Sequence, residues 1–180
     1  MATQAWTNAY KEIAQRITNK LPEKVLWVDL WHNQVGFLDR EHPFPTPSVF
    51  LAFRSLDIQD LGEHVQNVNF QVDMYFFYET FLDTYQGAYN QSDALVYLDT
   101  ISDLYNLFHG FTGDSFNALR RTAFRPVDTG SAGNLYVQSF TGLLHDEVAK
   151  RKFLPTSNKL KLGIEKGTNI IVPSNDFIVP

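Results

Sequence analysis

The sequence predicts an α+β protein: a mostly antiparallel sheet of about five strands with two main helices packed on it, in the order α-β-β-β-α-β-β. Two amphipathic helical segments and one strictly alternating strand carry this prediction. Of the 180 residues, 44% are hydrophobic and 19% are charged, which is typical of globular proteins and not of disordered chains. We expect a single α+β domain over residues 1–144, followed by a C-terminal extension or arm over residues 145–180.

The first helix is indicated by apolar residues that recur at spacings of four, three, four and four, namely Trp6, Tyr10, Ile13, Ile17 and Leu21. Pro22 cannot continue this helix. Residues 25–31 are rich in β-branched and aromatic side chains and read as a strand. Residues 32–47 contain Gly36 and three prolines and read as a loop, after which residues 48–54 form a second strand.

The clearest strand covers residues 68–78. Its apolar face is predicted to carry Val68, Phe70, Val72, Met74 and Phe76, and its polar face Asn69, Gln71 and Asp73. Tyr75 and Phe77 interrupt the polar face, so we expect that end of the strand to be covered as well. Residues 57–67 are polar and read as an exposed connection.

A second helix is predicted over residues 93–108, with Ser92 as its N-cap and Gly110 at its end. Strands over residues 119–127 and 135–144 follow, joined by a glycine-containing hairpin loop. Beyond residue 144 come a basic patch and two short apolar pieces, residues 170–172 and 177–179. Apolar pieces this short are expected to pack either on this domain or on a neighbouring subunit.

Composition limits the functions open to the chain. It has no cysteine, which excludes disulfides, Fe–S clusters and thiolate zinc sites. We find neither a signal peptide nor an apolar stretch of membrane-spanning length, and expect no membrane partner. Ten acidic residues and no Lys or Arg lie between Arg54 and Arg120, so we expect no sequence-specific nucleic-acid binding, although the later arginine strand leaves base stacking open as a weaker alternative.

Two Asp-x-x-His pairs flank the first proline-rich loop, Asp29 with His32 and Asp39 with His42. A carboxylate and an imidazole are metal ligands, but a working site needs three or four, and the spacing matches no helix-borne motif. A metal-dependent hydrolase that uses the His32 and His42 loop therefore stays an alternative. We assign no catalytic, cofactor or metal residue, expect no cofactor, and expect no enzyme.

Aromatic side chains exceed what a domain of this size obviously buries, and aromatics and arginines are enriched at the centres of protein interfaces. A larger core explains the same residues equally well. The residues predicted for a subunit or partner interface are Trp31, Phe50, Phe53, Tyr75, Phe77, Arg120, Arg121 and Arg125. An acidic pore or loop face is predicted at Asp57, Asp60 and Glu63.

The order and character of these segments resemble the tail-terminator, or tail-completion, proteins of long-tailed bacteriophages. The resemblance covers residues 5 to about 144 and rests on Val28-Asp29-Leu30, Pro47-Ser-Val-Phe-Leu-Ala-Phe, the long alternating strand, the helix beginning Ala94-Leu-Val-Tyr-Leu-Asp-Thr-Ile, and the arginine strand with its glycine hairpin. No invariant catalytic motif is involved.

The resemblance implies a structural protein that forms a hexameric ring on the head-proximal end of the tail tube. Such a ring stops tube polymerisation and joins the head-tail connector, so the implied partners are the chain itself, the tail-tube protein and the connector protein. The implied location is the host cytoplasm during assembly and then the virion. The acidic face would line the pore. The arm departs from the family pattern, which leaves another ring-forming neck component, a head-tail stopper or adaptor, as the nearest alternative.

Overall fold

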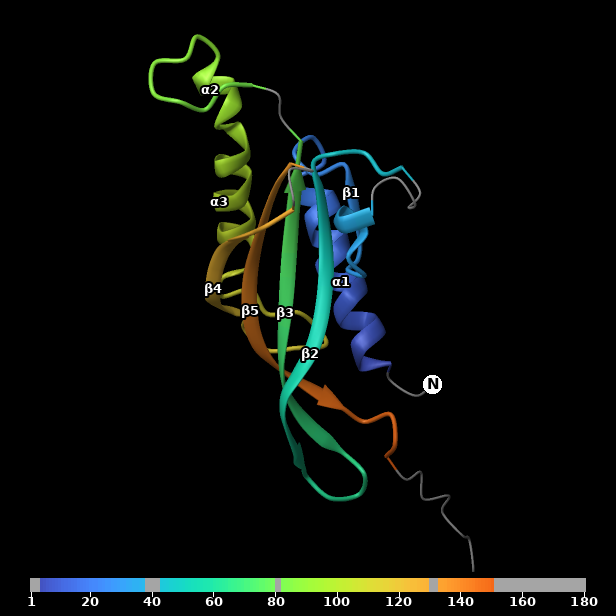
Figure 1. Ribbon diagram of the computed structural model, residues 1–180. Coiled ribbons are helices and arrows are strands. Elements are labelled where there is room, and N and C mark those ends of the chain that lie inside the picture. Colours follow the sequence, from blue (N-terminus) through green and yellow to red (C-terminus); the bar gives the residue numbers. More distant parts are fainter. Residues whose placement is uncertain (1–3, 38–42, 80–81, 130–132, 151–180) are drawn as a thin grey trace, which may run out of the picture.

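The computed structural model describes residues 4–37, 43–79, 82–129 and 133–150. Its elements are α1 (Ala5–Lys20), β1 (Trp27–Leu30), the 3-10 turn η1 (Gln34–Phe37), β2 (Ser48–Asp60), β3 (Gln66–Tyr78), α2 (Gln91–Ala94), α3 (Val96–Phe108), β4 (Arg120–Val127) and β5 (Asn134–Asp146) (Figure 1). The α+β class and the predicted element order are confirmed, with α2 as one extra turn before α3. Within the described ranges, no helix has the length and apolarity to cross a bilayer.

The five strands form one sheet in the order β1-β2-β3-β5-β4. Neighbouring strands are antiparallel except for β1 and β2, which are parallel. The predicted mostly antiparallel sheet is thus confirmed. β1 and β4 occupy the two ends of the sheet.

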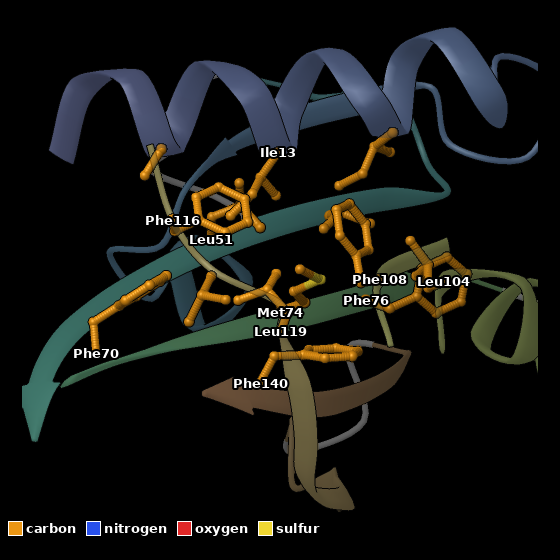
Figure 2. Packing of buried hydrophobic residues seen from close by; sticks show 14 of the residues in the cluster. Ile13, Leu51, Phe70, Met74, Phe76, Leu104, Phe108, Phe116, Leu119 and Phe140 are labelled. Carbon is orange, nitrogen blue, oxygen red and sulfur yellow. The ribbon is translucent and has the colours of Figure 1, made fainter. Parts of the chain in front are cut away.

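Both long helices pack on the same face of the sheet and bury the main core there. The alternating face of β3 points into this core, as its sequence predicts, because Phe70 and Val72 are fully buried and Met74 and Phe76 nearly so. Figure 2 shows α1 lying across β2 and β3, with Phe140 of β5 below them. The whole cluster is drawn from α1, α3, β2, β3 and β5 and from the segments before β1 and before β4.

A smaller cluster covers the opposite face of the sheet at one end. Phe50, Phe77 and Leu135 from three neighbouring strands are buried there against Val35 of η1. Trp31, Phe44, Tyr75 and Val127 surround them. The expectation that the Tyr75 end of the strand is covered on both faces is confirmed.

The boundaries of two predicted elements are wrong. Residues 57–67 are not a connection, because β2 and β3 stay paired as far as Asp60 and Gln66 and leave only a short turn. Ser92 is not the N-cap of the long helix, because it lies inside α2, and α3 begins at Val96 after Leu95. Hairpin pairing continues past the core because the ladder itself satisfies the backbone N–H and C=O groups.

Gly142 in β5 is a site where the core tolerates no side chain. A Cβ atom there would lie 2.8 Å from Cδ2 of Leu119 and 3.2 Å from Cε1 of Phe70. We expect Gly142→Ala to lower the free energy of unfolding by about 1–3 kcal/mol through overpacking. Urea unfolding monitored by tryptophan fluorescence measures this, and an unchanged midpoint would contradict the packing described here.

The ring of Tyr97 on α3 is buried against Tyr78 and Tyr136, with ring centroids 5.7 and 5.8 Å away. Burial, together with the hydrogen bond and the charge of Tyr136, raises the pKa of Tyr97 to about 12. The unfolded chain loses this proton near the ordinary pKa of 10, while the folded chain keeps it. The contribution of protonated Tyr97 to the stability of the folded state is therefore complete below pH 10 and is lost as the pH rises toward 12.

We accordingly expect the free energy of unfolding to fall more steeply between pH 10 and pH 12 in the native chain than in Tyr97→Phe. Denaturant titrations at several pH values in this window compare the two slopes. Equal slopes would show that Tyr97 does not carry this dependence.

Candidate assembly surface

The far part of the β2–β3 hairpin extends past both helices (Figure 1). Its strands remain in register from Asp57 opposite Asn69 to Asp60 opposite Gln66, after an irregularity between Ser55 and Asp57. Two neighbours in the ladder, Ile58 and Val68, therefore lie on the same face as the core residues of β3. β5 accompanies β3 to the same end, because Asp146 lies opposite Gln66.

The turn of this hairpin is built from local hydrogen bonds. Asp60 Oδ1 accepts the N–H of Gly62 at 2.9 Å, and the N–H of Val65 donates to the carbonyl of Gly62 at 3.0 Å. Glu63 and His64 both have positive φ, 51° and 61°. The acidic residues predicted as a pore or loop face, Asp57, Asp60 and Glu63, thus lie on the exposed end of β2 and in this turn.

Apolar side chains are exposed on the same segment. Leu56, Ile58 and Leu61 are 48%, 51% and 53% exposed. They alternate with, or adjoin, the acidic residues, so this end of the hairpin is both apolar and negatively charged. Large exposed apolar side chains clustered on one element are typical of a surface that contacts another chain.

β2 also has an open edge. β1 pairs with it only at Ser48–Leu51, and the N–H of Trp31 donates to the carbonyl of Leu51 at 2.9 Å before the chain turns away. No other strand of the described residues pairs with β2 on that side over residues 52–60. An unpaired edge is a template for a further strand.

A groove of about 720 Å³ runs beside this open edge. Trp6 and Tyr10 of α1 form one wall, and Phe53 of β2 forms the other. The remaining lining residues are Thr7, Leu30, Arg54 and Ser55. The lining is mainly apolar and aromatic, so the groove suits apolar side chains that project from a strand added to β2.

The opposite end of the sheet carries a basic open edge. Among the described residues β4 pairs only with β5, and its Arg120 and Arg125 are exposed. By register both arginines lie on the face away from the helices, opposite Thr141 and Val137. Asp57 points to this same face of the sheet, since it lies opposite Asn69 on the polar side of β3.

Arg121, the third predicted arginine, is held within its own chain. Its guanidinium carbon lies 3.7 Å from the ring centroid of Tyr105, and Nη1 donates to Oε1 of Gln138 at 3.1 Å. Gln138 in turn donates to the carbonyl of Ile101 at 2.8 Å. Arg121 therefore ties β4 to α3, while Arg120 and Arg125 remain exposed.

The predicted interface aromatics separate into buried and partly exposed residues. Phe50 and Phe77 are 1% exposed and belong to the smaller cluster, so this conformation does not offer them to a partner, and the larger-core interpretation holds for them. Trp31 and Tyr75 are half-buried and stacked at 4.2 Å on its rim. Phe53 is half-buried in the groove wall.

Burial, and then the charge of Asp73, raise the pKa of Tyr75.

Among the described residues, the structure shows no group of ligands that would support the metal-site alternative. His42 and Asp39 lie outside the described residues. Asp29 instead accepts the N–H of Leu30 at 2.7 Å, and the backbone N–H of His32 donates to Oε1 of Gln34 at 3.0 Å. In the ranges that the structure describes, no three His, Cys, Asp or Glu side chains group as metal ligands would.

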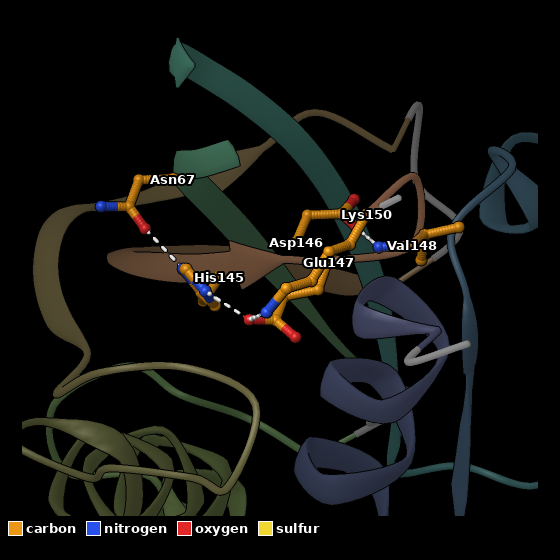
Figure 3. Close-up of polar contacts among 6 residues, drawn as sticks. All are labelled: Asn67, His145, Asp146, Glu147, Val148 and Lys150. Atoms are coloured by element: carbon orange, nitrogen blue, oxygen red, sulfur yellow. Dashed lines mark hydrogen bonds and ion pairs between the residues drawn. The ribbon is translucent and has the colours of Figure 1, made fainter. Parts of the chain in front are cut away.

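The chain leaves β5 at the far end of the projecting hairpin, where Asp146 lies opposite Gln66, through a small polar network (Figure 3). His145 contacts Asn67 of β3 at 2.8 Å and Glu147 at 3.1 Å, and Lys150 reaches Glu147 at 3.3 Å. Hydrogen bonds from Lys150 and then His145 lower the pKa of Glu147. His145 and Glu147 also line a hollow with Ala5 and Asn8, so the exit lies beside the first half of α1.

Sequence features that could have identified this surface were present but weak. Leu56, Asp57, Ile58 and Gln59 alternate between apolar and polar, which is the pattern of a strand. The open edge had no local signal, because it depends on the shortness of β1 and on the strand order.

No protein-family model matches the chain, and no curated protein matches its sequence. Among solved structures, a chain of the "Virion of native gene transfer agent (GTA) particle" is similar over 80% of this chain and 99% of that chain, with 8% sequence identity and a TM-score of 0.42. A likeness at this level carries no argument about function.

Proposed function

We propose that this protein is a structural protein that assembles head to tail with copies of itself into a ring. The observation that carries the proposal is the opposite charge of two open strand edges at opposite ends of one sheet. β2 presents Asp57 and Asp60 beyond the end of β1, and β4 presents Arg120 and Arg125. One copy's basic edge is complementary to the next copy's acidic edge.

A contact between two different surfaces of identical subunits is heterologous, and it closes into a ring when the rotation between neighbours divides a full turn. A closed ring of this kind has used all of its edge surfaces and offers no free edge for a further subunit in the plane. Its two outer rims remain free to contact other proteins.

The ring that we propose is a tail terminator of a long-tailed bacteriophage. Its partners are the tail-tube protein on one rim and the head-tail connector on the other, and it acts in the host cytoplasm during assembly and then in the virion. The support is the resemblance of residues 5 to about 144 to that family, together with the confirmed order of elements and the complementary edges. Catalysis has no part in this function.

Another neck component, a stopper or adaptor, would use the same ring contact and differ only in the proteins bound at its rims. No observation in the structure favours it over the terminator. The metal-dependent hydrolase likewise has no observation in its favour, since among the described residues no three His, Cys, Asp or Glu side chains group as metal ligands would.

The terminator function predicts an effect on tube length. Purified tail-tube protein should polymerise into tubes of variable length when alone, and into capped tubes that stop growing when this protein is added. Negative-stain length distributions measure the difference. Continued growth of tubes at a molar excess of this protein would exclude a terminator and leave the other neck components.

The acidic end of the hairpin is also proposed to face the pore, where negative charge would repel passing DNA. Glu63→Gln, at the turn and away from the proposed edge contact of Asp57 and Asp60, should slow DNA ejection and leave tail length unchanged. Ejection triggered in vitro and followed with a DNA-binding dye is the measurement. Ejection at the native rate would remove the pore role from this hairpin.

A further inference from the structure

We infer that residues 159–165 of this chain add as an extra strand to the open edge of β2 in the same molecule, and so cover the acidic edge before assembly. The observations are the unpaired edge over residues 52–60, the apolar groove beside it, and the sequence of the segment that follows Lys150. The pairing of this segment with β2 does not depend on the proposed ring. Only its consequence for assembly rests on the proposed function.

The segment has the pattern of an edge strand. Residues 159–165 read Lys-Leu-Lys-Leu-Gly-Ile-Glu, so Leu160, Leu162 and Ile164 share one face and the two lysines share the other. A strand beside β2 needs one apolar face and one charged face. Its apolar face would continue the surface of Phe53 and Ile58 toward the groove, and its charged face would lie on the side of Asp57.

The distance to be spanned is short. By register, Asp146 lies opposite Gln66, and Gln66 lies opposite Asp60. A strand added outside β2 at that level is three strand spacings from the end of β5, about 14 Å. The 12 residues from 147 to 158 reach up to about 40 Å when extended, so the connection can pass around the hairpin end.

The direction of the segment also matches the charges. A chain arriving at the tip end of β2 must run back along it, antiparallel to β2. Lys159 and Lys161 then come first, on the face of Asp57, and Glu165 comes last, toward Arg54 on that same face. Opposite charges on adjacent strands stabilise the pairing, while the reverse direction would set like charges together.

The occupant is the chain's own segment because of effective concentration. A segment tethered through a short connection competes at about millimolar concentration, well above the concentration of a second copy in dilute solution. An open edge with exposed Leu56 and Ile58 also invites edge-to-edge aggregation unless something covers it. The neighbour's basic β4 edge would displace this segment when the ring forms.

Disulfide cross-linking tests this pairing without interference from native thiols, because the native chain has no cysteine. We expect Ile58→Cys with Leu160→Cys to oxidise to a cross-link within one chain, seen as a monomer of faster mobility on a non-reducing gel and of monomer mass in denaturing mass spectrometry. The control pair is Leu98→Cys with Leu160→Cys, because Leu98 is exposed on α3 and this helix lies away from the projecting end of the hairpin (Figure 1).

A cross-link only between chains would overturn the inference in favour of a neighbour's segment. No cross-link above the control pair would overturn it as well. Hydrogen exchange supplies a second readout that needs no cysteine. Edge-facing amides of residues 53–60 should exchange at least about tenfold faster in Leu160→Asp with Leu162→Asp than in the native chain.

These replacements leave every residue of the described core unchanged, so global unfolding does not obscure the result. Equal exchange in both proteins would count against pairing with β2. The same double variant should form rings at lower concentration than the native chain. If the cross-link forms and no ring is found under any condition, the inference stands and the proposed function fails.

Discussion

Phe140→Ala is expected to lower the free energy of unfolding by about 3–5 kcal/mol, a large part of the stability of a domain of this size. Phe140 is fully buried in the centre of β5, and its ring meets the ring of Phe108 edge to face at 6.1 Å. Removing it leaves a cavity between the sheet and α3. The neighbouring strands are paired on both sides of β5 and cannot collapse into that cavity.

Equilibrium urea unfolding of the monomer measures this loss. Tyr89→Ala is the matched control, because Tyr89 is fully exposed and should change the stability by less than about 0.5 kcal/mol. A small effect of Phe140→Ala would mean that the core is not centred on β5 as the structure places it.

Reversing the charge of the basic edge should abolish assembly. With Arg120→Glu and Arg125→Glu, the β4 edge would face Asp57 and Asp60 of the next copy with like charge. Like charges set against each other across an interface cost several kcal/mol, so we expect the concentration needed for assembly to rise by about a hundredfold or more. Analytical ultracentrifugation over a concentration series measures this shift.

The second half of the experiment reverses the acidic edge in the same chain. Asp57→Lys and Asp60→Lys alone should also prevent assembly, and combining them with the reversed β4 edge should restore it. Glu23→Lys with Asp93→Lys is the control for total charge, because both residues are exposed on other elements. If the combined variant stays dispersed, the two edges do not meet in the assembly.

The helices and the inner strands could be predicted because their signals are local. The spacing of Trp6, Tyr10, Ile13 and Ile17 predicted α1 to within a residue at each end, and the alternation of residues 68–76 predicted which face of β3 is buried. Each of these patterns reflects burial against a single continuous core. Predictions made from these patterns therefore depend little on the order of the strands in the sheet.

The smaller cluster could not be predicted from local pattern. Val35 and Phe44 lie in a segment that reads as a loop, yet they cover Phe50 and Phe77 on the second face of the sheet. Nothing in the sequence near those two phenylalanines says whether a loop of the same chain or another subunit covers them. The sequence therefore left a core position and a partner surface as equal interpretations of these two residues.

The open edge of β2 shows a second limit of prediction from the sequence. Its location follows from three facts that lie far apart in the sequence: β1 has four residues, β2 has 13, and β1 pairs with the start of β2. The charge of the edge was visible in the sequence as part of the acidic block. That this charge lies on a strand edge, across the sheet from exposed arginines, is a property of topology.

Light scattering of the purified chain over a concentration series, alone and with the tail-tube protein, tests the central claim most directly. The account predicts a closed species of about six chains of 20.7 kDa each, visible as rings by negative stain, in at least one of the two conditions. A strict monomer in both conditions would contradict it.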